Sequence, residues 1–216
     1  MKICAISDTH NKHRDIKIPE SDVLICAGDI SMLGQEEIVN DFIEWFGSQN
    51  QQHKIMIFGN HEVGYSNHLN SKYIESQKLM KKYNIKYLQN SEIIIDNIKF
   101  YGSPATPYFG GLEWNYNRGR DISMIWDKIP DDTDVLITHG PAYGIHDIVY
   151  RKFFLTSNEG CSDLLNKINS LKIKAHICGH IHSGYGILKQ NNTTFVNAAL
   201  CDNHYSLINN PIVFNI

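Results

Sequence analysis

The chain has 216 residues, of which 42% are apolar and 20% are charged, and this length supports one domain with a full hydrophobic core. Its net charge is −3, and Lys and Arg are scattered, which argues against a basic surface for nucleic acid or anionic membranes. No run reaches the roughly 18 apolar residues of a membrane span. We therefore expect a single domain, residues 1–216, with no nucleic-acid or membrane partner.

The chain contains five cysteines, an odd number, and no two of them form a Cys-x-x-Cys pair. Cys4, Cys26 and Cys178 lie in apolar runs, where a free cysteine behaves as a small buried side chain. This pattern argues against a disulfide framework and a thiolate zinc site, and it favours a reducing compartment. The N-terminal apolar run is too short for a signal peptide, so we expect a cytoplasmic protein.

Residues 1–90 alternate between strand and helix patterns. Short apolar runs rich in β-branched residues, each ending in a polar turn, predict buried strands, and apolar residues spaced for one face predict helices. In chain order we predict strand 3–6, strand 23–27, helix 36–46, strand 55–58 and helix 69–83. Gly47 follows the first helix and is its predicted C-cap.

The rest of the chain adds hairpins to this pattern. Asp96-Asn97 separates two apolar runs, 93–95 and 98–101, and predicts a β-hairpin. Strand 135–138, helix 161–171 and strand 175–178 follow, and alternating runs then predict strands over residues 185–188, 193–196, 205–208 and 212–214. Strands that alternate with helices, together with hairpins, predict a mixed α/β domain, which two packed sheets flanked by helices would fit.

A polar cluster follows each of the five central strands. The clusters are Asp8-Thr9-His10, Gly28-Asp29, Gly59-Asn60-His61-Glu62, His139-Gly140-Pro141 and Gly179-His180-Ile181-His182. Ligands in α/β sheets bind beyond the carboxyl ends of the strands, so we expect these clusters to converge in space. An Asp or His in a single turn is usually a capping or hydrogen-bonding residue, and only the ordered set indicates a common site.

The residue types in these clusters suit a pair of divalent cations. Imidazole binds zinc, iron and manganese, while carboxylate and amide oxygens bind magnesium, manganese and iron. The carboxylate of Asp29 has enough lone pairs to bridge two ions, and Asn60 offers a neutral oxygen. Two divalent ions and two aspartates leave a charge of about +2, which attracts a phosphoryl group and stabilises an in-line displacement.

In this order the motifs resemble those of the calcineurin-like metallophosphoesterases: Asp-x-His, Gly-Asp, Gly-Asn-His-Glu/Asp, His and Gly-His-x-His. A narrower resemblance, to the metallophosphoesterase-domain-containing subfamily, lies in residues 102–104, 114–119, 138–142, 179–186, 195–198 and 211–214. Members of that subfamily are metal-dependent phosphodiesterases, active on cyclic nucleotides and on aryl phosphodiesters. The resemblance implies an α/β fold, a four-layer αββα sandwich of two mixed β-sheets flanked by helices.

The resemblance also implies roles for the motif residues. It implies two sets of metal ligands that share one member: Asp8, His10, Asp29 and His182 for one ion, and Asp29, Asn60, His139 and His180 for the other. Asp29 and His61 are the implied catalytic residues, and Asn60 and His61 are implied to contact the substrate. His61 binds no metal but stabilises the phosphoryl oxygens or protonates the leaving oxygen. Some subfamily members are weak enzymes with glycine in place of His180, which this chain retains.

The predicted function is metal-dependent hydrolysis of a small phosphodiester or nucleotide by a hydroxide that bridges two divalent ions. Cyclic nucleotides are among the candidate substrates. Mn, Fe, Zn and similar ions all suit the mixed ligand set, which does not select one of them. A phosphomonoesterase or a nucleotide or dinucleoside-polyphosphate hydrolase is the alternative on the same site, and a non-catalytic scaffold of the same fold is a further one.

Three features near the motifs have alternative interpretations. Glu62 is expected to hold His61 or its loop, with an exposed acidic cap as the alternative. His13 is either a substrate contact or a loop histidine, and the second is favoured. The stretch 101–120 predicts either aromatic stacking on a nucleobase or packing of the loop onto the protein, and packing is favoured. Its aromatic and basic side chains are Tyr108, Phe109, Trp114, Tyr116, Arg118 and Arg120.

Overall fold

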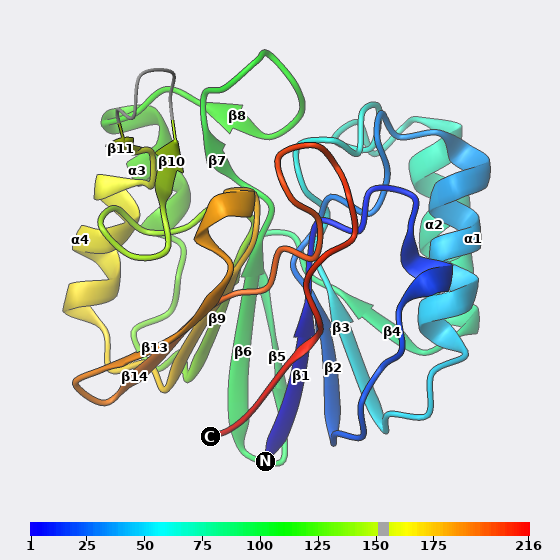
Figure 1. Ribbon diagram of the computed structural model, residues 1–216, viewed down its shortest axis with the longest axis horizontal. Helices are drawn as coiled ribbons and strands as arrows, with labels where there is room; N and C mark the ends of the chain where they lie inside the picture. The colour runs from blue at the N-terminus through cyan, green and yellow to red at the C-terminus, as the bar shows by residue number, and fades with distance from the viewer. Residues whose placement is uncertain (151–155) are drawn as a thin grey trace.

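The computed structural model describes residues 1–150 and 156–216. In this part of the chain two β-sheets face one another, and helices cover the outer face of each sheet (Figure 1). The layers run helix, sheet, sheet, helix, which confirms the predicted αββα sandwich of two mixed sheets. Every helix within the described residues is too short or too polar to cross a membrane.

The first sheet has the strand order β15-β1-β2-β3-β4. Its parallel strands are β1 (Lys2–Ile6), β2 (Val23–Cys26), β3 (His53–Met56) and β4 (Ile85–Tyr87), and β15 (Ile212–Asn215) pairs antiparallel with β1. Its outer face is covered by α1 (Glu36–Gly47) and α2 (Ser71–Lys82). The predicted C-cap is wrong, because Gly47 is the last helical residue and Ser48 caps α1. Gly47 instead allows a close approach, since a Cβ there would lie 2.5 Å from the Tyr83 side chain.

The second sheet has the strand order β13-β14-β12-β9-β6-β5. Its parallel strands are β6 (Ile98–Ser103), β9 (Val135–Thr138), β12 (Ala175–Cys178) and β14 (Thr193–Asn197). The antiparallel edge strands are β5 (Ser91–Ile95) and β13 (Gly186–Gln190), and the covering helices are α3 (Arg120–Trp126) and α4 (Ser162–Ser170). Short pairs stand above it: β7 (Thr106–Pro107) with β8 (Asn115–Tyr116), and β10 (Ile148–Tyr150) with β11 (Thr156–Asn158).

Side-chain alternation along the strands separates the apolar core into layers. Ile3 and Ala5 of β1 pack in the cluster between the two sheets, whereas Cys4 and Ile6 pack in the cluster that includes α1. In β9, likewise, Leu136 belongs to the cluster with α3 and α4. Successive residues of a strand point to opposite faces, so strands buried on both faces are apolar at every position, as the sequence runs indicated.

The structure corrects the prediction at residues 205–208. These residues form a loop with one isolated bridge, Cys201 to Leu207, and Tyr205 has a left-handed φ of 58° that no strand accommodates. The Asp96-Asn97 hairpin is confirmed, and its two turn residues have φ of 49° and 62°. The elements not predicted, among them β4, β7, β8 and α3, are short and are defined by pairing or packing rather than by a local pattern.

The carboxyl ends of the parallel strands of both sheets meet at one edge of the sandwich. Residues directly after β1 and β14 join the sheets there, because Ser7 forms a parallel bridge with Ala199. The amide of Ser7 donates to the carbonyl of Ala198 at 2.9 Å, and the amide of Leu200 donates to the carbonyl of Ser7 at 2.9 Å. The motif that follows each strand is therefore carried to the same edge.

Candidate metal centre and active-site cavity

Predicted ligands from all five motifs meet at this edge. Within the described residues they form two groups, in each of which the donor atoms lie within 4.8 Å of one another: Asp8, His10 and His182 in the first, and Asp29, His139 and His180 in the second. Asn60 adjoins the second group, with Oδ1 2.9 Å from His139 Nε2. The Oδ2 atom of Asp29 lies 3.2 Å from His139 Nε2 and 3.9 Å from His10 Nε2, so it faces both groups.

Backbone carbonyls orient the imidazole rings at this centre. The Nδ1 atoms of His10, His139 and His182 lie 3.2, 2.8 and 2.7 Å from the carbonyl oxygens of Ser31, Ala27 and Asp202. A carbonyl oxygen only accepts, so each Nδ1 carries a proton, and each ring in its neutral form would present an Nε2 lone pair to the centre. Histidine ligands of metal ions are typically held this way.

The donor atoms therefore fit a pair of cations. His10 Nε2 and His182 Nε2 are 3.2 Å apart, with both lone pairs directed into one space. Carboxylate oxygens of Asp8 and Asp29 lie beside them, at 3.3 Å from His182 Nε2 and 3.9 Å from His10 Nε2. Lone pairs at this spacing repel unless a cation or a proton lies between them. Imidazole and carboxylate together provide the mixed donor set that suits transition-metal dications.

Burial and charge act in opposite directions on the pKa values of these groups. Burial favours a higher pKa for Asp8, but the hydrogen bond to His182 and the charges of His182 and His139 lower it to about 2. Burial likewise favours a lower pKa for His139, but the charge of Asp29 and the hydrogen bond to it raise it to about 9. The carboxylates and imidazoles thus stabilise one another's charged forms, and a cation bound among them would take over the compensating role of the protons.

Several motif residues have an unusual backbone conformation. Asp8, His10, Asp29 and His180 have φ of 52°, 40°, 53° and 66°, in the left-handed region that residues other than Gly adopt uncommonly, although Asp and His are among those that do so more often. Strained backbone of this kind collects at functional sites, where the surrounding structure holds it. Here it turns each side chain back toward the centre directly after its strand.

Gly179 permits the close contact between the first and fifth motifs. A Cβ atom at this position would lie 2.0 Å from Asp8 Oδ2 and 2.1 Å from Ser7 Oγ. The next residue, His180, donates its amide to both carboxylate oxygens of Asp8 at 3.0 and 2.9 Å. The close packing of these two loops therefore requires glycine before His180, because a residue with a Cβ atom does not fit there.

Glu62 holds the loops that carry two of the motifs, as expected, and the alternative of an exposed cap is wrong. Its carboxylate is fully buried and accepts the amides of Asp29, Ser31 and Gly59 at 3.0, 3.0 and 2.7 Å. The Ser31 hydroxyl donates to it as well, at 2.9 Å. Burial and the charge of Asp29 raise the pKa of Glu62 to about 8.

His61 stands beside the centre without entering either ligand group. Its Nδ1 lies 2.6 Å from the Met32 carbonyl oxygen, so Nε2 faces the cavity, 4.0 Å from Asp29 Oδ2. Its amide donates to Asp29 Oδ1 at 2.9 Å, which leaves Asp29 Oδ2 directed at the ligand groups. Whether His61 contacts substrate and not metal stays a prediction, for which its Nε2 atom is suitably oriented.

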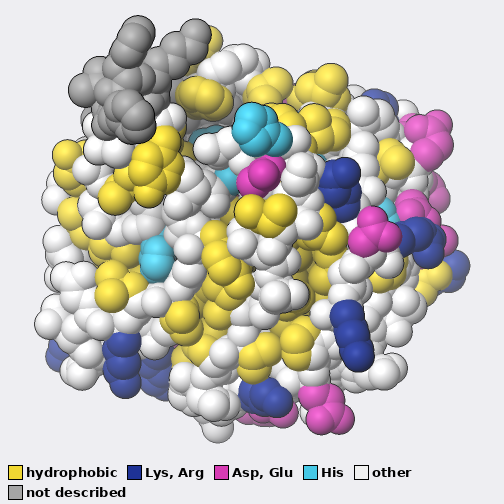
Figure 2. Space-filling model, in the orientation of Figure 1, with side chains coloured by type: hydrophobic (Ala, Val, Ile, Leu, Met, Phe, Trp, Pro, Cys, Tyr) yellow, Lys and Arg dark blue, Asp and Glu magenta, His cyan; other side chains and the backbone are white. Residues whose placement is uncertain are grey.

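A cavity of about 480 Å³ opens above the centre. Asp29, Asn60, His61, His180 and His182 form its floor, and its walls include Tyr108, Phe109, Pro141, Tyr150 and Tyr205. Figure 2 shows hydrophobic side chains along the upper edge and across the middle of the face it displays, while Lys and Arg lie mainly toward the bottom and right of it. The cavity can therefore accommodate a small molecule that has a phosphoryl group and apolar substituents.

The aromatic side chains of residues 101–120 fall into two sets, one packed onto the protein and one exposed in the cavity. Trp114 is buried and stacks on Phe58 at 5.9 Å between ring centroids, and Tyr116 is half-buried, so these two pack as favoured. Tyr108 and Phe109 are 65% and 68% exposed and line the cavity. His13 is buried against α1, with Nε2 2.8 Å from Asp41 Oδ2, so its interpretation as a substrate contact is wrong.

Sequence reasoning did not single out three residues that the structure places at the site. Tyr205 lies over the first ligand group, and Asp202 supplies the carbonyl that orients His182. Asn197 is fully buried at the end of β14 and donates to the carbonyls of Gly179 and Ile181 at 3.3 and 2.9 Å, which supports the fifth motif. Its position directly after the predicted strand 193–196 was the one hint available for it.

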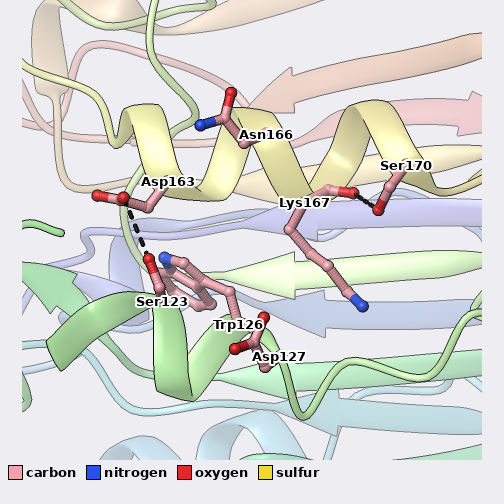
Figure 3. Close-up of a pocket in the computed structure, with 7 residues that line it drawn as sticks. All are labelled: Ser123, Trp126, Asp127, Asp163, Asn166, Lys167 and Ser170. Carbon is pink, nitrogen blue, oxygen red and sulfur yellow. Dashed lines mark hydrogen bonds between the residues drawn. The ribbon is translucent and has the colours of Figure 1, made fainter. Parts of the chain in front are cut away.

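A second hollow, of about 330 Å³, lies between α3 and α4 on the outer face of the second sheet (Figure 3). Ser123 of α3 donates to Asp163 of α4 across it at 3.1 Å. Its lining residues drawn in Figure 3 include no histidine, and Lys167 pairs with Asp131 at 3.3 Å. The hollow contains none of the motif residues and is separate from the candidate centre.

Comparisons with known proteins agree with this geometry. Residues 1–184 match the calcineurin-like phosphoesterase family. Human metallophosphoesterase domain-containing protein 1 is 36% identical over 233 residues, which span all of this chain and 71% of that protein. A UPF0046 protein of Caenorhabditis elegans is 35% identical over 226 residues, with coverage of 100% and 75%.

A solved structure shows the same fold at low identity. Phosphopantetheinyl hydrolase from Mycobacterium tuberculosis superposes with a TM-score of 0.60 at 14% identity, over 91% of this chain and 88% of that chain. The two ligand groups and the family match point to metal-dependent cleavage of phosphoric esters. This chain therefore belongs to the calcineurin-like phosphoesterase family, and it is a phosphoric ester hydrolase with a dinuclear site for divalent metal ions.

Proposed function

We propose that this protein is a phosphodiesterase for small substrates, and that its motif residues hold two divalent ions. The ligands of the first ion are Asp8, His10, Asp29 and His182, and those of the second are Asp29, Asn60, His139 and His180. The distances between their donor atoms support this division, because Asp29 Oδ2 faces both groups. When bound, such a pair of ions lowers the pKa of water and neutralises charge on the phosphoryl oxygens.

The charge of the cavity walls carries the preference for diesters. Arg118 is the only Lys or Arg among the described residues that line the cavity. Its guanidinium donates to the carbonyls of Gly160 and Glu159 at 2.6 and 2.8 Å, so it is already engaged by the backbone. A polyphosphate or a monoester dianion gains from additional cations. A diester carries one negative charge and two organic groups, which suit a cavity whose other walls are largely apolar and aromatic.

The chain's own residues would orient the reactants and supply a proton. Water adds to phosphorus as one P–O bond to an organic group breaks, which yields a monoester and an alcohol. The hydrogen bond from Nδ1 of His61 to the Met32 carbonyl fixes the ring so that Nε2 faces the cavity. His61 would deliver a proton from Nε2 to the leaving oxygen, and Asn60 would contact the phosphoryl group.

Paired substrates test this proposal. The protein is loaded with Mn²⁺, and kcat/KM is measured for bis(p-nitrophenyl) phosphate, p-nitrophenyl phosphate, 2′,3′- and 3′,5′-cyclic nucleotides, and a dinucleoside polyphosphate. We expect kcat/KM to be highest for diesters, because the described wall residues provide apolar contact and, apart from Arg118, no Lys or Arg. A higher kcat/KM for the monoester or the polyphosphate would refute the assignment as a phosphodiesterase.

Removal of a single ligand tests the centre itself. Asp29→Ala removes the oxygen shared by both groups, and His139→Ala removes a buried donor, so each is expected to lower metal-dependent diester turnover by at least about 10³-fold. His68→Ala is the matched control, because His68 is exposed and stacks on Tyr73 away from the cavity. Turnover of either variant at the level of the control would contradict the proposed centre.

A further inference from the structure

We infer that two aromatic subsites flank the centre and bind the two organic groups of a phosphodiester, with Tyr205 contacting the leaving group and Phe109 the retained group. This inference rests on the proposed function and assigns the side chains that contact each substituent of its substrate. Both residues line the cavity, and each lies against a different ligand group.

Tyr205 covers the first ligand group. Its ring centroid lies 4.7 Å from that of His10 and 5.6 Å from that of His182, with both contacts edge-to-face. The side chain remains 37% exposed, so part of the ring is open to a ligand in the cavity. The His61 ring centroid lies 6.3 Å away, which places Tyr205 on the side where a proton can reach the leaving oxygen.

A tight turn holds Tyr205 in this position. The Asp202 carboxylate accepts the amides of His204 and Ser206 at 2.9 and 2.8 Å, and the Asp202 carbonyl accepts the amide of Tyr205 at 2.9 Å. Tyr205 itself has φ of 58°, which is unfavourable for a bulky side chain. Gly or Asn would form this turn with less strain, so the ring, rather than the turn, accounts for tyrosine here.

The Asp202 turn also couples the Tyr205 ring to the metal ligands. The Asp202 carbonyl that accepts the Tyr205 amide also accepts Nδ1 of His182 at 2.7 Å. The ring and the ligand are therefore positioned by one backbone group. A planar group that contacts Tyr205 would lie beside the first ligand group.

Phe109 stands at the second ligand group. Its ring centroid lies 6.0 Å from that of His180 in an edge-to-face contact, and 68% of the residue is exposed. The Asn115 side chain holds the loop, accepting the Phe109 amide at 2.5 Å and donating to the carbonyls of Leu112 and Glu113. An exposed aromatic ring on a tied loop beside a cavity loses little conformational freedom when a ligand covers it.

The two rings account for both substituents of one substrate. A phosphorus atom placed between the ligand groups extends one ester group toward Tyr205 and the other toward Phe109. Stacking on aromatic rings tolerates different planar groups, because every aryl ring or nucleobase has a π face. Aryl and nucleoside diesters are thus the class that fits, and alkyl diesters leave one or both subsites unfilled.

Two diesters with the same leaving group separate the subsites. Bis(p-nitrophenyl) phosphate has an aryl group on both sides, whereas methyl p-nitrophenyl phosphate retains only a methyl group after nitrophenolate departs. We expect Phe109→Ala to lower kcat/KM about tenfold for the bis-aryl ester, mainly through KM, and less than twofold for the methyl ester. Tyr205→Ala is expected to lower kcat/KM about tenfold for both esters, and Tyr205→Phe is expected to restore it.

Controls separate stacking from loss of structure. Tyr143→Ala removes a 46% exposed aromatic side chain that does not line the cavity, and it should change neither rate. Rates are divided by the bound metal content of each variant, and Tyr205→Leu is included because it keeps bulk beside His10 without a π face. Equal losses on both esters for Phe109→Ala, or wild-type rates for Tyr205→Ala and Tyr205→Leu, would overturn the two subsites. Wild-type protein that cleaves p-nitrophenyl phosphate but neither diester would instead overturn the proposed function.

Discussion

The carboxylate of Glu62 ties together the second and third motif loops. It accepts three backbone amides, from Asp29, Ser31 and Gly59, in a site with no exposed surface. Backbone amides that lose a buried acceptor stay unsatisfied, because a site with no exposed surface gives them no contact with solvent water. The positions of Asp29 and Asn60 therefore depend on a side chain that is not itself a predicted metal ligand.

Substitution of Glu62 tests this dependence. Glu62→Ala is expected to lower the free energy of unfolding by about 3 kcal/mol, since three buried amides lose their acceptor at about 1 kcal/mol or more each. It should also weaken metal binding by about 10- to 100-fold, as loss of supporting partners does at other metal sites. Urea unfolding and metal titration measure the two effects. Glu113→Ala, which removes the acceptor of one amide, from Gly64, is the control, and equal effects of the two variants would refute the role.

At the scale of elements, the β5–β6 hairpin shows how local sequence and sheet pairing agree. Asp96 and Asn97 both have positive φ, as a two-residue turn of type I′ requires, and Ile95 pairs with Ile98 across it. The turn precedes β6, whereas the motif edge lies after Ser103 at the other end of that strand. The hairpin therefore stabilises the sheet without touching the centre.

The hairpin turn is therefore a site where stability and activity should separate. Asn97→Val forces a β-branched side chain into the left-handed region and is expected to lower the free energy of unfolding by about 1–2 kcal/mol. Asn97→Gly, the matched control, should leave it unchanged or raise it. Urea unfolding measures the stability, and diester turnover below the unfolding transition should equal that of the wild type for both variants. A large loss of turnover in Asn97→Val would show that the hairpin influences the centre.

At the scale of the whole molecule, acid sensitivity depends on histidines buried in neutral form. His176 of β12 is 1% exposed, with Nε2 2.8 Å from Thr138 Oγ1, and burial lowers its pKa to about 3. The unfolded chain binds a proton at this side chain below about pH 6.5, while the folded chain does not until about pH 3. Stability is therefore present above pH 6.5 and is lost as the pH falls toward 3.

His176→Gln removes this contribution. Between pH 7 and pH 5 the wild type should lose about 2 kcal/mol more unfolding free energy than the variant, because one proton binds only to its unfolded chain over most of that interval. Urea unfolding at matched pH and metal concentration measures the difference, in which the titrations of other groups cancel. Parallel pH profiles for the two proteins would show that His176 is protonated in the folded state.

Much of the fold follows from patterns that are local in the sequence. Apolar runs indicated β1, β2, β9 and β12, which are buried on both faces, and one-face periodicity indicated α1, α2 and α4. Short elements such as β4 and β7 escaped prediction because neighbouring strands, and not their own residues, decide that they pair. Residues 205–208 alternate like a strand, yet the Asp202 turn bends them into a loop. Strand propensity yields here to local hydrogen bonds between the Asp202 side chain and the backbone amides that follow it.

The sequence by itself determined which residue types are available for a metal centre, because five motifs in order carry the histidines, aspartates and asparagine. Only the tertiary structure decided their geometry, because Asp8 and His182 are far apart in the chain and meet only where β1 and β12 end at one edge. It also decided which imidazole nitrogen faces the centre, through carbonyls such as that of Asp202. The tertiary structure also decided that Tyr205 lies against the first ligand group and Phe109 against the second. Contacts between rings that are far apart in the chain leave no trace in the local sequence.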